Sequence, residues 1–281
     1  MKLAIFLALL IPFEQTQPQS TNDAYTIFEK SLSAMEAVKT ASYTVNIKER
    51  IKDRFVYDRY NVKMQSDPFR TYVYSIQPNP GAEALFLEGC NNGKCLVNPN
   101  RFPYINLNLS PHSMLLRKNH QYNILQMGFS YMRNLLSHYE TLYGTAFVNM
   151  IARTPDTESE GVSYINLVID NPDYGYKNYT VLKGETVVSI GDKLHINDHM
   201  ILELNPNIDN YEDVYPGQII KVPNSFARKI VLRIDKTTLL PMAQTVFDEK
   251  GLYSVVEFRN FILNPVLRPE DFSKDNPQYG F

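Results

Sequence analysis

A compact segment with its own order of strands and helices occupies residues 179–223, which read YTVLKGETVVSIGDKLHINDHMILELNPNIDNYEDVYPGQIIKVP. Residues 179–182 predict a short strand. The tight turn Lys183-Gly-Glu-Thr186 follows, and the hydroxyl of Thr186 is placed to cap a helix. Val187, Ile190 and Leu194 then recur at helical spacing, which predicts a helix over 187–194.

The second half of the segment predicts another helix and a closing strand. Asn197 can cap a helix that runs through Leu204. Asn205-Pro206 ends that helix, because the residue before a proline avoids the α region. A turn at 215–217 leads into a strand over 218–222, so the order is strand, helix, helix, strand.

This segment resembles the LysM domain, a small module that binds N-acetylglucosamine-containing glycans. One departure is Gly191, where the family usually has alanine, and glycine weakens a helix slightly. The residues that carry the resemblance are Tyr179-Thr-Val, Lys183-Gly-Glu-Thr186, Ile190, Leu204-Asn-Pro-Asn-Ile208 and Tyr215-Pro-Gly-Gln-Ile-Ile-Lys-Val-Pro223.

The resemblance implies a shallow glycan-binding groove between two loops. Backbone groups in these loops can pair with an N-acetyl group, Ile208 offers its methyl an apolar contact, and Gly184 leaves room for close approach. The alternative is that these residues only fold the module, and that a single copy binds weakly. The implied glycan-binding residues are Gly184, Glu185, Thr186, Asn205, Pro206, Asn207 and Ile208.

Strand patterns flank the module at 163–169 and 229–234. A strand-helix-helix-strand unit has adjacent ends and can be inserted into a hairpin loop. We therefore expect these two strands to pair, with the module projecting from their connection. The predicted division of the chain is a signal peptide at 1–20, a host domain at 21–175 and 225–281, and the LysM domain at 176–224.

The host predicts an α+β fold: a helix over 23–39, a series of alternating strands from Ala41, a helix over 119–139 and further strands. This pattern resembles the LolA-like periplasmic domain, whose curved antiparallel sheet forms an incomplete barrel with helices in its mouth. It is most similar to an uncharacterised LolA-like family with an internal LysM module. The supporting segments are 110–120, 234–241, 253–264 and Tyr279-Gly-Phe281.

The LolA-like resemblance implies an acyl-chain cavity between sheet and helices, and methionine suits a pocket that adapts to different chains. The alternative is that an aromatic and methionine stripe at helical spacing is simply core. Residues on the helix side of such a cavity would be Met127, Phe129, Tyr131, Met132 and Leu135.

The first residues predict export. Lys2 is followed by an apolar run over 3–13, which has the dimensions of a signal peptide and is too short to span a bilayer. A buried N-terminal helix is the alternative. An exported chain meets an oxidising compartment. Asn92-Gly93 is a hairpin turn signal that sets Cys90 opposite Cys95, so we expect a disulfide between them.

No catalytic or metal-binding signature stands out in the sequence. His-Glu-x-x-His, Gly-x-Ser-x-Gly and phosphate-binding glycine motifs are absent. His195 and His199 straddle a turn and are expected at the surface. Glu158 and Glu160 fall in a polar loop. We therefore predict no enzyme, no cofactor and no metal; the alternative is a wall hydrolase or transferase that uses His112 and His120.

Composition agrees with a binding protein of the cell envelope. The net charge of −2 among 281 residues gives no attraction to nucleic acid, and an uncharged sugar needs none. The sequence thus predicts a periplasmic or envelope protein that binds peptidoglycan, with a host domain for a hydrophobic ligand, a lipoprotein or an envelope protein. A purely structural envelope protein is a further alternative.

Overall fold

The computed structural model describes residues 21–281, and the predicted signal peptide lies outside them. The host is built on an antiparallel sheet of 11 strands in the order β6-β5-β4-β3-β2-β1-β13-β12-β11-β8-β7. The strands are β1 (Thr40–Ile51), β2 (Arg54–Ser66), β3 (Phe69–Gln77), β4 (Glu83–Leu87), β5 (Cys95–Asn98), β6 (Leu107–Leu109), β7 (Ile151–Ser159), β8 (Val162–Asp170), β11 (Lys229–Asp235), β12 (Pro241–Asp248) and β13 (Gly251–Leu263).

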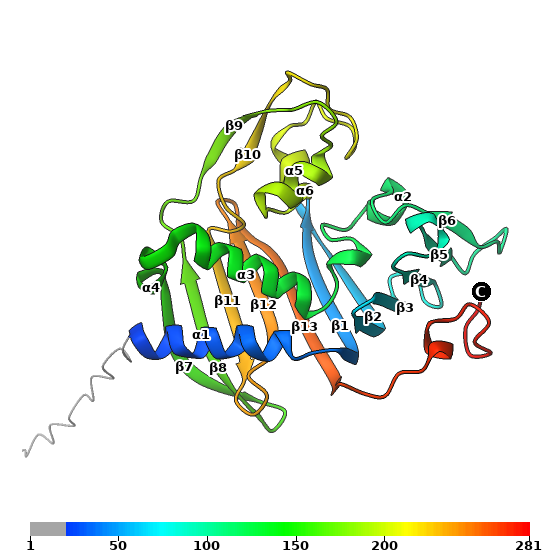
Figure 1. Cartoon of the computed structure of the whole chain (residues 1–281), viewed down its shortest axis with the longest axis horizontal. Coiled ribbons are helices and arrows are strands. Elements are labelled where there is room, and N and C mark those ends of the chain that lie inside the picture. Colours follow the sequence, from blue (N-terminus) through cyan, green and yellow to red (C-terminus); the bar gives the residue numbers. More distant parts are fainter. Residues whose placement is uncertain (1–20) are drawn as a thin grey trace, which may run out of the picture.

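The sheet is strongly curved but open, since β6 and β7 form its two edges (Figure 1). Alternation fixes its inner face. Along β11, Ile230, Leu232 and Ile234 are fully buried, while the residues between them are partly exposed. The predicted α+β fold with a curved antiparallel sheet is therefore confirmed.

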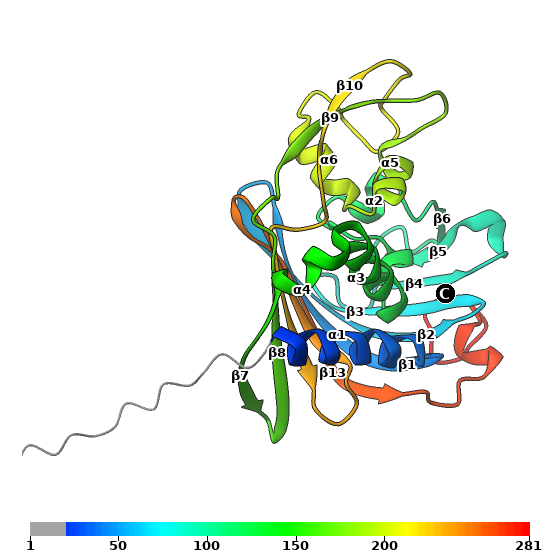
Figure 2. The same cartoon turned by 60° about the vertical axis from the view of Figure 1, so that its left-hand side comes forward.

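Helices lie on the inner side of the sheet (Figure 2). Phe28 from the first helix and Leu136 and Tyr139 from the third are buried in the same apolar core as the sheet residues. Within residues 21–281, no helix is both long enough and apolar enough to cross a bilayer. The host helices are α1 (Thr21–Glu36), α2 (Met114–Arg117), α3 (Phe129–Tyr143) and α4 (Phe147–Met150), with short 3-10 turns η1 (Asn91–Gly93), η2 (Ile124–Gln126), η3 (Gly144–Ala146) and η4 (Pro269–Phe272).

The predicted helix over 119–139 starts too early. Asn123 caps the short turn η2, and Gly128 follows with φ of +81°, a conformation that interrupts any α-helix of L-residues. The helix α3 therefore begins only at Phe129 and continues to Tyr143. This break leaves residues 111–128 free to form an irregular wall beside the sheet.

The inserted segment has the predicted order. Its elements are β9 (Tyr176–Thr180), α5 (Val187–Leu194), α6 (Asp198–Leu204) and β10 (Ile219–Pro223). Thr186 and Asn197 cap the two helices as expected. β8 pairs with β11, from Lys229 opposite Asp170 onward, so the strands on either side of the insert are direct neighbours as predicted.

The module does not simply project from that hairpin; it folds back onto the host (Figure 1). Met200 of α6 is buried in the host core. The guanidinium of Arg117, at the end of α2, donates two hydrogen bonds of 2.7 Å to the carboxylate of Asp198. Burial of this ion pair and of Met200 explains why the module is docked.

The predicted disulfide is wrong in this structure, because both cysteines are free thiols. The connection between β4 and β5 is longer than a two-residue turn: Leu85 pairs with Leu96, and η1 lies within the loop. That register does not set Cys90 opposite Cys95. Cys90 is exposed, whereas Cys95 is fully buried, and burial raises the pKa of its thiol to about 12.

Candidate functional site

The first loop of the module is held rigid by its own side chains. The carboxylate of Glu185 accepts hydrogen bonds from the Tyr179 hydroxyl, the Leu182 amide and the Lys193 ammonium, and the latter two measure 2.8 Å. Thr186 closes a capping box with Ser189. Both predicted site residues therefore shape the loop, which leaves the exposed Gly184 at its tip.

The second loop separates structural residues from accessible ones. The buried amide of Asn205 bonds to the carbonyls of Ile201 and Lys221 and to the Lys221 amide. Ile208 is also buried, in the apolar core of the module. Its side chain is thus not on the surface, contrary to the expected contact with a sugar methyl. Pro206 and Asn207 are exposed.

The two loops belong to one rigid unit. The amide of Val187, which follows the first loop, donates to the carbonyl of Tyr211, which follows the second. Val187 and Ile208 are also buried in the same apolar cluster. The accessible predicted groups are therefore Gly184, Pro206 and Asn207, presented on a fixed backbone.

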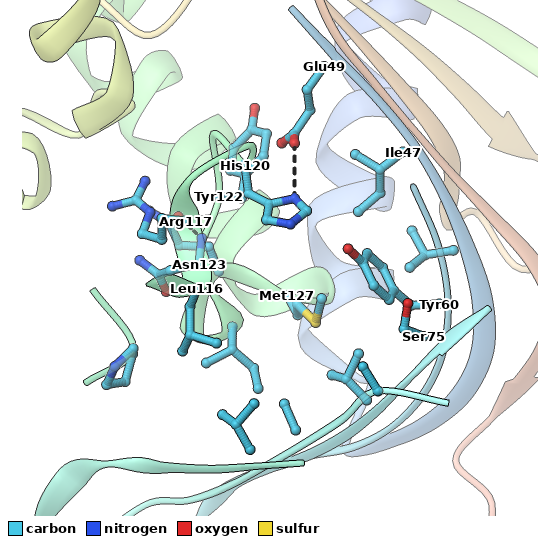
Figure 3. Close-up of a pocket in the computed structure, with 18 of the residues that line it drawn as sticks. Ile47, Glu49, Tyr60, Ser75, Leu116, Arg117, His120, Tyr122, Asn123 and Met127 are labelled. Atoms are coloured by element: carbon cyan, nitrogen blue, oxygen red, sulfur yellow. Dashed lines mark hydrogen bonds and ion pairs between the residues drawn. The ribbon is translucent and has the colours of Figure 1, made fainter. Parts of the chain in front are cut away.

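The host contains a cavity of about 300 Å³ between the inner face of the sheet and residues 111–132. Figure 3 shows its lining, with Ile47 and Tyr60 on the sheet side and Leu116 and Met127 opposite. Most of the lining is apolar, and it also includes charged side chains, among them Glu49, Arg117 and His120. Ligand sites occupy roughly 300–1,000 Å³ and commonly combine apolar walls with a few polar groups, so this volume is at the lower end of that range.

The predicted helix-side residues divide into two groups. Met127, Tyr131 and Met132 line the cavity. Phe129 is buried against Phe258 in the core, with ring centroids 4.8 Å apart. Leu135 is also buried in the core. Three of the five predicted residues therefore form part of the cavity wall, and the other two pack in the hydrophobic core.

Three ionisable side chains cluster at the polar end of the cavity, and two of them, Glu49 and His120, line it. Glu49 lies on β1 and Asp58 on β2, and Nδ1 of His120 lies 3.6 Å from Glu49 Oε2 and 3.2 Å from Asp58 Oδ2. Figure 3 shows the carboxylate of Glu49 directed at the His120 ring. Burial lowers the pKa of His120, but hydrogen bonding and charge interactions with the two carboxylates outweigh it and raise that pKa to about 9. Burial raises the pKa of Glu49.

A second buried charge joins the cavity to the module. Arg117 lines the cavity, and its side chain is only 1% exposed. Besides binding Asp198, its guanidinium lies 3.9 Å from the centre of the Tyr211 ring. Hydrogen bonds of Arg117 to Asp198 therefore connect the wall of the host cavity directly to the LysM segment.

Comparison with protein families assigns both regions. A model described as "Protein of unknown function (DUF1571)" matches residues 38–182, more than half of the chain. The chain belongs to the DUF1571 family. The LysM domain model matches residues 179–223 of this DUF1571 protein, so the inserted segment is a LysM domain, as its sequence predicted. No curated protein matches the chain.

Solved structures similar to the DUF1571 chain include one described as a LolA superfamily protein and one described as a putative outer membrane lipoprotein-sorting protein domain. LolA superfamily protein NE2245 from Nitrosomonas europaea is 13% identical, with a TM-score of 0.35 and coverage of 90% of this chain and 98% of that one. Lipoprotein LppX from Mycobacterium tuberculosis is 10% identical, with a TM-score of 0.41 and coverage of 88% and 99%.

The histidines of the DUF1571 protein occupy different environments. His195 is exposed and stacks on His138 at 3.8 Å between ring centroids. His199 was predicted at the surface but is largely buried, with Nδ1 3.1 Å from the Tyr211 hydroxyl; burial lowers its pKa to about 4. His112 lies 3.5 Å from the Asn123 amide, whereas His120 faces the two carboxylates.

Sequence reasoning missed Glu49 and Asp58, although each carries a signal. Glu49 continues the inward-facing series that begins at Tyr43, and Asp58 precedes Tyr60 and Val62 on the same face of β2. A carboxylate at a position that alternation assigns to the interior is unusual. That pattern marks Glu49 and Asp58 as buried carboxylates, although it does not place them beside His120.

Proposed function

We propose that this protein is an exported envelope protein that binds peptidoglycan, or a related N-acetylglucosamine glycan, through its LysM domain. The observation that carries the proposal is the exposed pair of loops at Gly184 and at Pro206-Asn207, which a buried apolar core holds in place. The host domain, residues 21–175 and 225–281, would then be retained at the cell wall.

The loops suit an uncharged ligand. Gly184 has φ of +83°, and a Cβ added there would meet no atom within 4 Å, so the loop tip is open to a sugar ring. Backbone amides and carbonyls supply hydrogen bonds that need no charged partner. A single module has no avidity, which predicts weak, reversible retention.

Sedimentation with purified peptidoglycan sacculi tests this proposal. Wild-type protein is expected in the pellet, and Asn207→Ala combined with Gly184→Ala is expected in the supernatant. Lys177→Ala provides the matched control, since Lys177 is an exposed residue of the same module on β9. Equal retention of all three proteins would exclude the proposed loops.

A second function is supported by the cavity: binding of a small apolar ligand, such as an acyl chain. Val256 lines the cavity on β13, and Val255 beside it points to the other face of the sheet. Val256→Phe should fill the cavity, whereas Val255→Phe should not. Mass spectrometry of co-purified lipids is expected to detect ligand with wild type and Val255→Phe only.

We propose that the protein binds peptidoglycan without cleaving it. Incubation of the pure protein with sacculi should therefore release no soluble muropeptides, measured by reversed-phase chromatography. Release that disappears in His112→Gln or His120→Gln would instead support the wall-cleaving alternative.

A further inference from the structure

The polar end of the cavity brings together three metal-ligating side chains from distant parts of the chain. Glu49 and Asp58 come from neighbouring strands, and His120 comes from the segment before η2. Their donor atoms all lie within 4.8 Å of one another. Figure 3 shows the Glu49 carboxylate and the His120 ring facing each other at the edge of the cavity.

The proton on His120 cannot satisfy both carboxylates. Glu49 and Asp58 have side chains only 2% and 3% exposed, and the oxygens that face His120 are both buried. One Nδ1–H donates to one oxygen at a time, so the other buried oxygen is left without a donor. With both carboxylates ionised, an imidazolium between them also leaves one net negative charge inside the protein.

A divalent cation solves both problems. With a neutral imidazole, two carboxylates and a charge of +2, the cluster is neutral, and each donor atom has a ligand bond. First-row ions bind carboxylate oxygen and imidazole nitrogen at about 2.0–2.2 Å, which sets neighbouring donors about 3.0–3.6 Å apart. The observed separations from Nδ1, 3.2 and 3.6 Å, fall in that range.

We propose that Glu49, Asp58 and His120 bind a divalent first-row transition metal ion, with Zn²⁺ as the best fit. One nitrogen and two oxygen ligands favour such an ion over Mg²⁺, which prefers oxygen ligands and keeps several waters. The site is distinct from the LysM loops and does not depend on glycan binding.

The surroundings hold the ligands in place. The Gln121 amide donates to Glu49 Oε1 at 3.2 Å, and the buried Gln121 side chain bonds to the carbonyls of Arg50 and Tyr253. Such outer contacts orient a ligating carboxylate. Glu49 and His120 also line the cavity, so an ion bound by them would lie next to its interior.

Isothermal titration of Zn²⁺ into untagged, chelator-treated full-length protein tests the proposal. Wild type is expected to bind one Zn²⁺ per chain, and Mg²⁺ is expected to give no comparable binding. Glu49→Gln and Asp58→Asn should each weaken Zn²⁺ binding at least ~10-fold, since each removes a charged ligand while preserving shape. His120→Gln should also abolish the Co²⁺ absorption bands of the wild type.

His138→Gln is the matched control, because it removes an imidazole from the stacked pair with His195 and leaves the cavity intact. It should bind Zn²⁺ like wild type. If His120→Gln does not fold, as judged by circular dichroism, the two isosteric carboxylate variants still decide the question. Absent stoichiometric binding, unchanged affinity in both carboxylate variants, or loss only in His138→Gln would overturn the proposal.

Discussion

The LysM domain and the host domain are organised in opposite ways. The module has a small, filled apolar core, and the polar side chains of its loops bond within the module, as Glu185 and Asn205 do. The host has a much larger core with a cavity, and buried charges line that cavity. The difference indicates that the module presents a rigid outer surface, whereas the host offers interior volume.

The two regions meet through buried charges. Arg117 binds Asp198, and Arg50, which bonds to Asp248 in the host, lies 3.8 Å from Glu203 in α6. Since these contacts involve residues beside the cavity, the docking of the module and the shape of the cavity depend on each other.

The largest expected effect comes from the ion pair that joins them. Asp198→Ala leaves the 1% exposed Arg117 side chain without its partner, which should lower the free energy of unfolding by about 3–5 kcal/mol. Urea denaturation of the full-length protein measures this. Glu160→Ala breaks the exposed pair with Arg259 and should cost less than about 1 kcal/mol. Equal losses of unfolding free energy in the two variants would show that the Arg117–Asp198 pair stabilises the protein no more than an exposed ion pair does.

Two asparagines in one loop should differ sharply. Asn205→Ala removes three side-chain hydrogen bonds, one to Ile201 in α6 and two to Lys221 in β10, so we expect a loss of about 2–3 kcal/mol in stability. Asn207→Ala, at an exposed position, should change stability by no more than about 0.5 kcal/mol. Thermal or urea unfolding distinguishes them. If Asn207→Ala were destabilised, a loss of glycan binding in this variant could not be assigned to the binding site.

Alanine substitutions at two glycines with positive φ, one in the host and one in the module, compare the packing of the two regions. A Cβ at Gly128 would lie 2.3 Å from Met64 Sδ, so Gly128→Ala combines backbone strain with displacement of a buried side chain and should cost about 2 kcal/mol. Gly184→Ala meets only backbone strain, about 1 kcal/mol. The same unfolding measurements apply. A larger loss at Gly184 would contradict the open loop tip.

The smallest effect concerns the thiols and leaves stability unchanged. Cys90 is exposed, whereas burial raises the pKa of Cys95 to about 12. Iodoacetamide at neutral pH should therefore alkylate Cys90 alone in the folded protein and both cysteines in urea, as mass spectrometry would show. Protection of both until a reductant is added would restore the disulfide that the sequence predicted.

The module was predictable because its determinants are local. Thr186, Asn197 and Asn205-Pro206 act within a few residues of the helix ends that they define. The α+β class and the pairing of β8 with β11 also followed from local alternation and from the position of the insert. The start of α3 could not be predicted in this way. The positive φ of Gly128 interrupts a segment whose apolar spacing is typical of a helix.

The polar end of the cavity was not predictable in the same way. Glu49, Asp58 and His120 are brought together by strand pairing and by the irregular segment after α2, and no short motif contains them. The side chain of Ile208 was assigned to the surface by family resemblance, but its burial depends on packing against Val187 and its neighbours. Such contacts follow from tertiary structure alone.

We propose that the module loops bind glycan and the host cavity binds an apolar ligand as separate functions of one folded protein. One experiment measures both in parallel: sedimentation with sacculi and lipid mass spectrometry for Asn207→Ala and Val256→Phe. We expect Asn207→Ala to lose binding to sacculi and to keep the co-purified lipid, whereas Val256→Phe should keep binding to sacculi and lose the lipid. Loss of both functions in either variant, or of neither, would contradict it.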